Sequence, residues 1–186
     1  MLMLDVADDS IKELSSAILH TFRDETIHLA DAAQHHKNER RGVIRRMSIS
    51  RLPPVLVIQL KRFRSTGFGD LQQVTKITRG IGLQTELSIP QEVLSPSCVY
   101  NNGQPYQLQA VIYHHGADAS SGHYTATVRI ADTSWRHIDD ATVAPVSEAQ
   151  VISGAIEASD ANWAALTLSS STHEATTLRP MRRTIE

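Results

Sequence analysis

The sequence predicts an α+β fold that is mostly antiparallel β-sheet, with one clear helix near its N-terminus. Short runs of β-branched and aromatic residues, separated by glycine, proline, asparagine and aspartate turns, recur through most of the chain. A clear helical spacing of apolar residues occurs only in the first 25 positions. The 186 residues are 41% apolar and 20% charged, which is typical of a chain with a packed core.

Charge and cysteine content exclude several classes of protein. Lysine plus arginine is 18 and aspartate plus glutamate is 20, a net charge of −2, so we expect no nucleic-acid partner. A single cysteine excludes an internal disulfide framework and a multi-cysteine zinc site. The first residues, MLMLDVADDS, do not resemble a signal peptide, and no stretch approaches the ~20 apolar residues of a membrane span. These features favour a cytoplasmic or nuclear protein with no membrane partner.

The first third of the chain predicts a strand, a helix and two further strands. Residues 1–6 form the first strand. Ser10 is the expected N-cap of the helix, with Glu13 completing a capping box, and the apolar residues recur at helical spacing. Residues 31–42 are polar and predict a loop, and 43–51 predict an edge strand. Pro53-Pro54 lead into residues 55–60 (VLVIQL), a buried strand. The helical apolar face consists of Ile11, Leu14, Ile18 and Phe22.

The remaining two thirds predict further strands joined by turns. A glycine-bearing turn follows residue 63, residues 74–89 are β-prone, and 90–94 predict one helical turn. Strands are expected at 106–114, 123–131 and 135–138, with a loop of glycine and small polar residues between the first two. Residues 147–152 predict a short helix. Residues 169–186 lack periodicity and predict a disordered tail.

Two strand ends carry residues suited to acid–base chemistry. His123 follows Gly122 at the start of one strand, and Asp139 and Asp140 end the next. If these strands pair as a hairpin, His123 and Asp139 lie at the same end. The carboxylate could then accept a hydrogen bond from one ring nitrogen, leaving the other to take a proton from a nucleophile. Taken alone, a histidine next to glycine is more often structural than catalytic, and two aspartates after a strand usually form a turn. The pattern also supplies no nucleophile.

A metal-binding β protein is a second reading of the same region. Histidine and carboxylate side chains are suitable ligands for several divalent metals. The candidate ligands would be His114, His115, His123 and Asp139.

Three segments resemble the ubiquitin-specific protease family. Residues 52–63 (LPPVLVIQLKRF) are similar to its LP-x-x-L-x-x-x-LKRF strand. Residues 106–124, with His114, Gly116 and the sequence Ser-Gly-His-Tyr, resemble the family's histidine box, and residues 135–143 resemble the segment that follows it. The order and approximate spacing agree, and the resemblance covers roughly residues 2–152.

The resemblance implies a papain-like cysteine protease fold, in its palm and fingers half, and the removal of ubiquitin from proteins. His123 would be the base that activates a thiol, Asp139 would hold its imidazole, and Asp140 could share that role. The implied partners are ubiquitin and ubiquitylated proteins, and no cofactor or metal is implied. The positions lining a narrow channel for the Gly-Gly tail of ubiquitin would be His114, Gly122 and Tyr124.

The chain departs from the family at the nucleophile. The family's N-x-G-N-T-C-Y box is absent, and the one thiol, Cys98, has no helix start behind it that would lower its pKa. The paired CxxC zinc motifs are absent too. We therefore expect residues 1–168 to be the C-terminal part of a catalytic domain that is inactive alone. The alternative is a catalytically dead module that binds ubiquitin.

Overall fold

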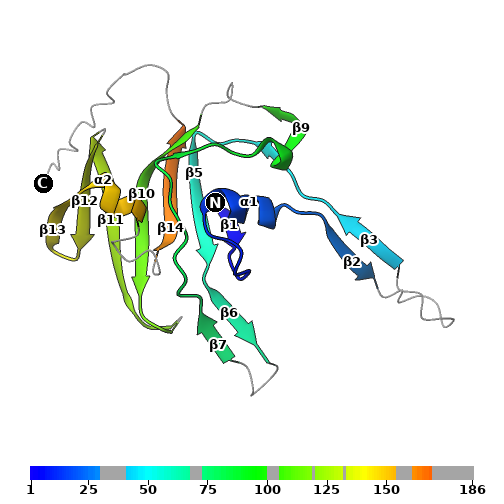
Figure 1. Cartoon of the computed structure of the whole chain (residues 1–186), viewed down its shortest axis with the longest axis horizontal. Helices are drawn as coiled ribbons and strands as arrows, with labels where there is room; N and C mark the ends of the chain where they lie inside the picture. The colour runs from blue at the N-terminus through cyan, green and yellow to red at the C-terminus, as the bar shows by residue number, and fades with distance from the viewer. Residues whose placement is uncertain are drawn as a thin grey trace, which may run out of the picture.

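An eight-stranded sheet is the main body of the computed structural model, which describes residues 1–29, 41–67, 73–99, 105–118, 120–131, 133–153 and 161–168 (Figure 1). Within this sheet β1 pairs with β5 in parallel, and the other pairs are antiparallel. The mostly antiparallel α+β prediction is therefore confirmed. The strand order is β1 (Leu2–Asp5), β5 (Val55–Lys61), β14 (Ala161–Leu168), β10 (Tyr106–His115), β11 (His123–Ala131), β12 (Ser134–Asp139) and β13 (Thr142–Val146), and β8 (Glu86–Leu87) pairs with β10.

The core lies between the sheet and helix α1 (Leu14–Thr21), which contacts β1. On β5, alternate residues are buried, as a strand with one face on the core requires. Each fully buried leucine or isoleucine contributes about 1.5–3 kcal/mol of hydrophobic stabilisation. Fully buried members include Leu4, Ile18, Ile58 and Leu108.

The predicted start of the helix at Ser10 is wrong. The Ser10 hydroxyl donates to a carboxylate oxygen of Asp8 in a local turn, and the helix begins at Leu14. Glu13 is the N-cap and forms a capping box with Ser16. The aspartates before Ser10 offer it a nearer partner than the helix backbone, since short polar side chains favour such turns.

Two hairpins and a small strand pair form separate two-stranded sheets outside the main sheet. The hairpin of β2 (Glu25–Leu29) and β3 (Arg41–Arg45) projects away from the main sheet, and the hairpin of β6 (Phe63–Thr66) and β7 (Gln73–Lys76) continues from β5 (Figure 1). The small pair is β4 (Ile49–Arg51) with β9 (Leu94–Val99).

The predicted single strand over residues 43–51 is therefore wrong, because it is divided between two sheets. β3 pairs with β2, whereas β4 pairs with β9. Ion pairs of Arg45 with Glu25 and of Arg46 with Asp24 hold the end of β3 on β2. Of the predicted loop 31–42, residues 31–40 lie outside the described part of the chain and the last two begin β3.

Two arginines fix the segment that follows β7. Arg62 is fully buried and donates to the carbonyl oxygens of Ile77 and Arg79. Arg79 in turn donates to the carbonyl oxygens of Val6, Asp8 and Ile11 and pairs with Asp9. Buried carbonyls require such donors, so these contacts join the segment after β7 to the turn between β1 and α1.

The C-terminal strands form a continuous meander. In this meander each strand pairs with the next, in the order β10, β11, β12 and β13. Helix α2 (Glu148–Ser153) follows, close to the helix predicted at 147–152. Earlier in the chain, a 3-10 turn at Gln91–Val93 matches the turn predicted at 90–94. Trp135 of β12 is fully buried under the guanidinium of Arg129, 5.6 Å from its ring centre. The tail 169–186 lies outside the described residues, and no helix among the described residues has the length and apolar character of a membrane span.

Candidate active site

The predicted His–Asp pair forms at one end of the β11–β12 hairpin. The register pairs Ala126 with Ile138, so His123, at the start of β11, lies at the same end as Asp139, the last residue of β12. The distance from His123 Nε2 to an Asp139 carboxylate oxygen is 2.6 Å. Both side chains are about half exposed, 47% and 48%. Among the described residues Nδ1 makes no hydrogen bond, so one ring nitrogen is held and the other is available.

The carboxylates raise the basicity of this imidazole. The hydrogen bond that the ring donates to Asp139 is the largest cause of a raised pKa at His123, and the charges of Asp139 and Asp140 act in the same direction. Partial desolvation lowers the pKa and is the second-largest effect, smaller than that of the hydrogen bond. The protonated imidazolium is therefore favoured over a wider pH range than for a free histidine.

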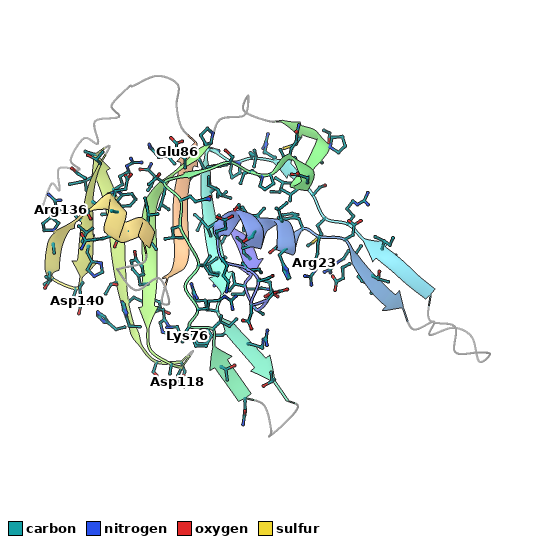
Figure 2. The ribbon with its side chains drawn as sticks, viewed as in Figure 1. Arg23, Lys76, Glu86, Asp118, Arg136 and Asp140 are labelled. Atoms are coloured by element: carbon teal, nitrogen blue, oxygen red, sulfur yellow. The ribbon has the colours of Figure 1, made fainter. Side chains whose placement is uncertain are left out.

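Asp140 lies beside the pair at the turn into β13 (Figure 2). It adopts a positive φ of 48°, a conformation that aspartate tolerates better than most residues. Its carboxylate is within 4.8 Å of ligand atoms of His123 and Asp139. It makes no hydrogen bond to His123 among the described contacts, so its influence on the imidazole is through space.

The four-residue metal site considered from sequence is not assembled. Successive strand residues point to opposite faces of a sheet, and His114 and His115 follow this rule: His114 packs against Tyr124, whereas His115 Nε2 shares a 2.8 Å hydrogen bond with Thr125. Within the described ranges, only His123, Asp139 and Asp140 bring three metal-ligating side chains together. Because Nε2 of His123 is already bonded to Asp139, the geometry favours a hydrogen-bonded pair.

The three predicted substrate-channel residues lie together next to the pair, in different environments. His114 is 2% exposed and its ring centre is 4.8 Å from that of Tyr124, which is 53% exposed. Phe63 of β6 contacts the other side of His114, at 5.7 Å between ring centres. A Cβ atom on Gly122 would approach His114 Nε2 and the carbonyl oxygen of His115 far inside 3.0 Å. The chain's own packing therefore requires glycine at this position.

Lys76 is the residue near this site that sequence reasoning missed. Its ammonium donates to the carbonyl oxygens of His114, at 2.5 Å, and of Gly116, at 2.9 Å. The residues are 38 and 40 positions apart, and a lysine at the end of a strand usually faces solvent. No local pattern could have identified it.

Cys98 lies far from the pair along the sheet. Burial, and in second place the negative charge of the ionised Cys98 thiol, raise the pKa of Tyr106 to about 12, so the thiol lies near the first residue of β10. His123 pairs with His115, the last residue of the same ten-residue strand. At ~3.3 Å per residue the two ends of β10 are about 30 Å apart. The thiol cannot reach His123 in this structure.

The chain matches a known protein family over most of its length. The family model "Ubiquitin carboxyl-terminal hydrolase" matches residues 4–171. Ubiquitin carboxyl-terminal hydrolase 10 of Mus musculus is 36% identical over 155 residues, covering 81% of this chain and 19% of the relative. Probable ubiquitin carboxyl-terminal hydrolase 3 of Schizosaccharomyces pombe is 38% identical over 140 residues, covering 75% and 26%. The chain thus spans about a fifth to a quarter of these relatives.

A solved structure has a similar fold. The SAGA DUB module Ubp8/Sgf11/Sus1/Sgf73 bound to ubiquitin aldehyde contains a chain that superposes with a TM-score of 0.69 at 25% identity, covering 91% of this chain and 36% of that one. The papain-like α+β fold is thereby confirmed. The chain belongs to the ubiquitin-specific protease family, whose family model is named ubiquitin carboxyl-terminal hydrolase.

Proposed function

We propose that His123 is the general base, and Asp139 its orienting carboxylate, of a cysteine-type hydrolase that cleaves the bond at the C-terminus of ubiquitin. The observation that supports this is the 2.6 Å contact between His123 Nε2 and Asp139. It holds the imidazole through one nitrogen and leaves Nδ1 for a thiol.

The chemistry follows from that arrangement. Nδ1 takes the thiol proton, and the thiolate sulfur forms a bond to the carbonyl carbon of the last ubiquitin glycine. As the carbon–nitrogen bond breaks, the leaving amine takes the proton back from Nδ1. A water molecule then attacks the thioester, losing its proton to Nδ1 and releasing the carboxylic acid and the thiol. Asp139 keeps the ring orientation and stabilises the imidazolium at each stage, and Asp140 adds negative charge nearby.

The proposed partners are ubiquitin and ubiquitylated proteins. Exposed Tyr124 and the glycine-lined start of β11 offer a narrow surface next to the base, which suits a tail without side chains. His114 is buried below this surface, so we assign it the support of Gly122 and Tyr124 within the predicted channel.

The thiol is proposed to lie on a part of the catalytic domain outside this sequence. Cys98 is the one cysteine, and it lies at the opposite end of β10 from the base. Residues 1–168 would then be the C-terminal part of the domain, and the chain alone would be inactive.

Hydrolysis of a fluorogenic ubiquitin C-terminal amide tests both parts of the proposal. The purified chain should give no turnover. A chimera in which residues 2–168 replace the matching segment of the mouse relative should hydrolyse the substrate, and His123→Ala in that chimera should lower kcat/KM by about 10³-fold or more. His20→Ala, on α1, is the matched control and should change kcat/KM less than about twofold.

Each contrary outcome has a distinct meaning. Turnover by the chain alone, abolished by Cys98→Ser, would refute the assignment of the thiol to another segment. Full activity of the His123→Ala chimera would refute the role of the base. Ubiquitin binding by a chimera that never turns over, although the unaltered relative does, would favour a catalytically dead ubiquitin-binding module.

A further inference from the structure

Lys76 links the β6–β7 hairpin to the strand that leads to His123. It is the last residue of β7 and pairs with Phe63, the first residue of β6. From there its ammonium reaches across to β10 and donates to the carbonyl oxygens of His114 and Gly116. Figure 2 shows Lys76 at the base of its hairpin, beside the end of β10.

The two carbonyls lie beyond Tyr113, the last residue of β10 for which the structure gives a partner in β14. β14 pairs with β10 only as far as Tyr113, and the described part of the chain places no strand on that side of His114 or Gly116. Hydrogen bonds from an ionised donor are roughly twice as strong as neutral ones. Lys76 therefore stabilises the backbone just beyond the described pairing of β10 with β14.

The segment held by Lys76 supports the residue that precedes the base. A Cβ on Gly116, whose φ is 138°, would lie 3.0 Å from the carbonyl oxygen of Ser121 and 3.1 Å from Gly122 Cα. Gly122 in turn lies directly on His114 Nε2 and the His115 carbonyl, with no room for a side chain. The two ends of the loop between β10 and β11 are thus in contact, and the position of Gly122 follows from the backbone at 114–116.

We propose that Lys76 is a positioning residue for the His123–Asp139 pair. By holding the carbonyls of His114 and Gly116 it fixes the surface on which Gly122 rests, and His123 follows Gly122 in the chain. The β6–β7 hairpin and the start of β11 then move as one unit. The effect on hydrolysis rests on the proposed function, but the positioning does not, and it is measurable in the chain alone.

The direction in which the pKa of His123 changes when Lys76 is replaced separates positioning from a simple effect of charge. The titratable groups facing His123 are Asp139, Asp140 and His115, whose ring centre lies 6.1 Å from that of His123. Removing the Lys76 cation would, through space alone, raise the pKa of the imidazole. Loosening the contact with Asp139 would lower it, because that hydrogen bond is the main cause of its raised value. Positioning therefore predicts a fall where charge alone predicts a rise.

Histidine-selective NMR titration of the 186-residue chain tests the proposal. Lys76→Met should lower the pKa of His123 by about 0.5 or more and weaken the resonance of an Nε2 proton hydrogen-bonded to carboxylate. Lys76→Arg, which keeps a charged donor, should preserve both. Lys61→Met makes the same change at an exposed lysine at the end of β5 and should leave His123 unaltered.

A folded Lys76→Met chain with an unchanged or raised pKa at His123 would overturn the proposal. If Lys76→Met does not fold, Lys76→Ala removes the donor without placing a long apolar side chain there, and an unchanged or raised pKa in that variant overturns the proposal equally. Because no hydrolysis is measured, failure of the proposed function would not affect either outcome.

Discussion

Replacing Gly122 by alanine should distort the site at the point where its two loop ends touch. The added methyl would lie well inside 3.0 Å of the His115 carbonyl oxygen and of His114 Nε2, and 3.1 Å from His114 Cε1. Carbon atoms are in favourable contact at about 3.5–4.0 Å. The His115 oxygen belongs to a paired strand and cannot rotate away, so the backbone itself must move.

The loss of stability expected for Gly122→Ala has two sources. Gly122 has a φ of 155°, a conformation that costs a residue with a side chain about 1–3 kcal/mol. Forcing extra volume into packed surroundings typically costs about 1–3 kcal/mol more. We expect Gly122→Ala to lower the free energy of unfolding by about 2–6 kcal/mol. The loss would be smaller if the backbone shifts and displaces His123 from Asp139.

Urea unfolding followed by tryptophan fluorescence, to which the fully buried Trp135 contributes, measures the loss of stability. NMR titration of His123 measures the displacement, as a lowered pKa. Gly82→Ala is the control, because its Cβ would lie 3.3 Å from the Lys12 carbonyl without a positive φ, and it should cost less than about 1 kcal/mol.

A second substitution tests the cause. His114→Ala in the Gly122→Ala background removes the ring contact but leaves the His115 carbonyl in place, so it should relieve the strain only in part. The two substitutions should therefore be non-additive by about 1 kcal/mol. A Gly122→Ala chain with both the stability and the His123 pKa of the parent would refute the close approach that this reasoning uses.

Three other substitutions test the pair, the core and the arginine contacts. Asp139→Asn should lower the pKa of His123. Because the pKa of His123 is raised in the folded chain, the pair stabilises the fold fully below the unfolded pKa of ~6.5 and progressively less as the pH rises through the folded value. A difference in the free energy of unfolding between variant and parent that stays constant with pH would contradict the assignment. Leu108 is fully buried in β10, so Leu108→Ala should cost about 2–5 kcal/mol in urea unfolding. Ile112, on the same strand, is 40% exposed, so Ile112→Ala should cost less than about 1 kcal/mol. Equal costs would mean that the assigned burial is wrong. Arg79→Lys should cost about 2–4 kcal/mol in urea unfolding, since one ammonium cannot replace a guanidinium that contacts three carbonyls and a carboxylate. Undiminished stability would show that these contacts contribute little.

The strands near the site were predictable because their residues meet the demands of a buried sheet. The runs predicted at 55–60, 106–114 and 123–131 correspond to β5, β10 and β11, each rich in β-branched or aromatic residues. The peripheral strands β2, β3 and β9 were missed or misplaced. Their sequences mix charged or turn-forming residues, and pairing with a particular neighbour holds them extended. Such pairing is a long-range property that a local pattern does not contain.

The contact between His123 and Asp139 was predictable for the same local reason, since a short hairpin connection fixes which strand ends meet. Support from other parts of the chain was not predictable. Lys76 acts across a separation of 38 residues. The glycine at 122 could be read as space for a ligand, but the distances show that His114 and the His115 carbonyl of the same chain require it.

The His123–Asp139 contact depends mainly on one stretch of chain. β10, β11, β12 and β13 are successive neighbours, Gly116 and Gly122 are in contact within the same meander, and Trp135 packs under Arg129 from the adjacent strand. Lys76 is one contribution from outside this meander that bears directly on it. The imidazole is therefore oriented by residues of this sequence without help from a thiol. In the proposed reaction, the thiol-bearing segment would meet a base whose Nε2 is already held and whose pKa is already raised, so most of the ordering entropy of the pair is lost on folding rather than during the reaction.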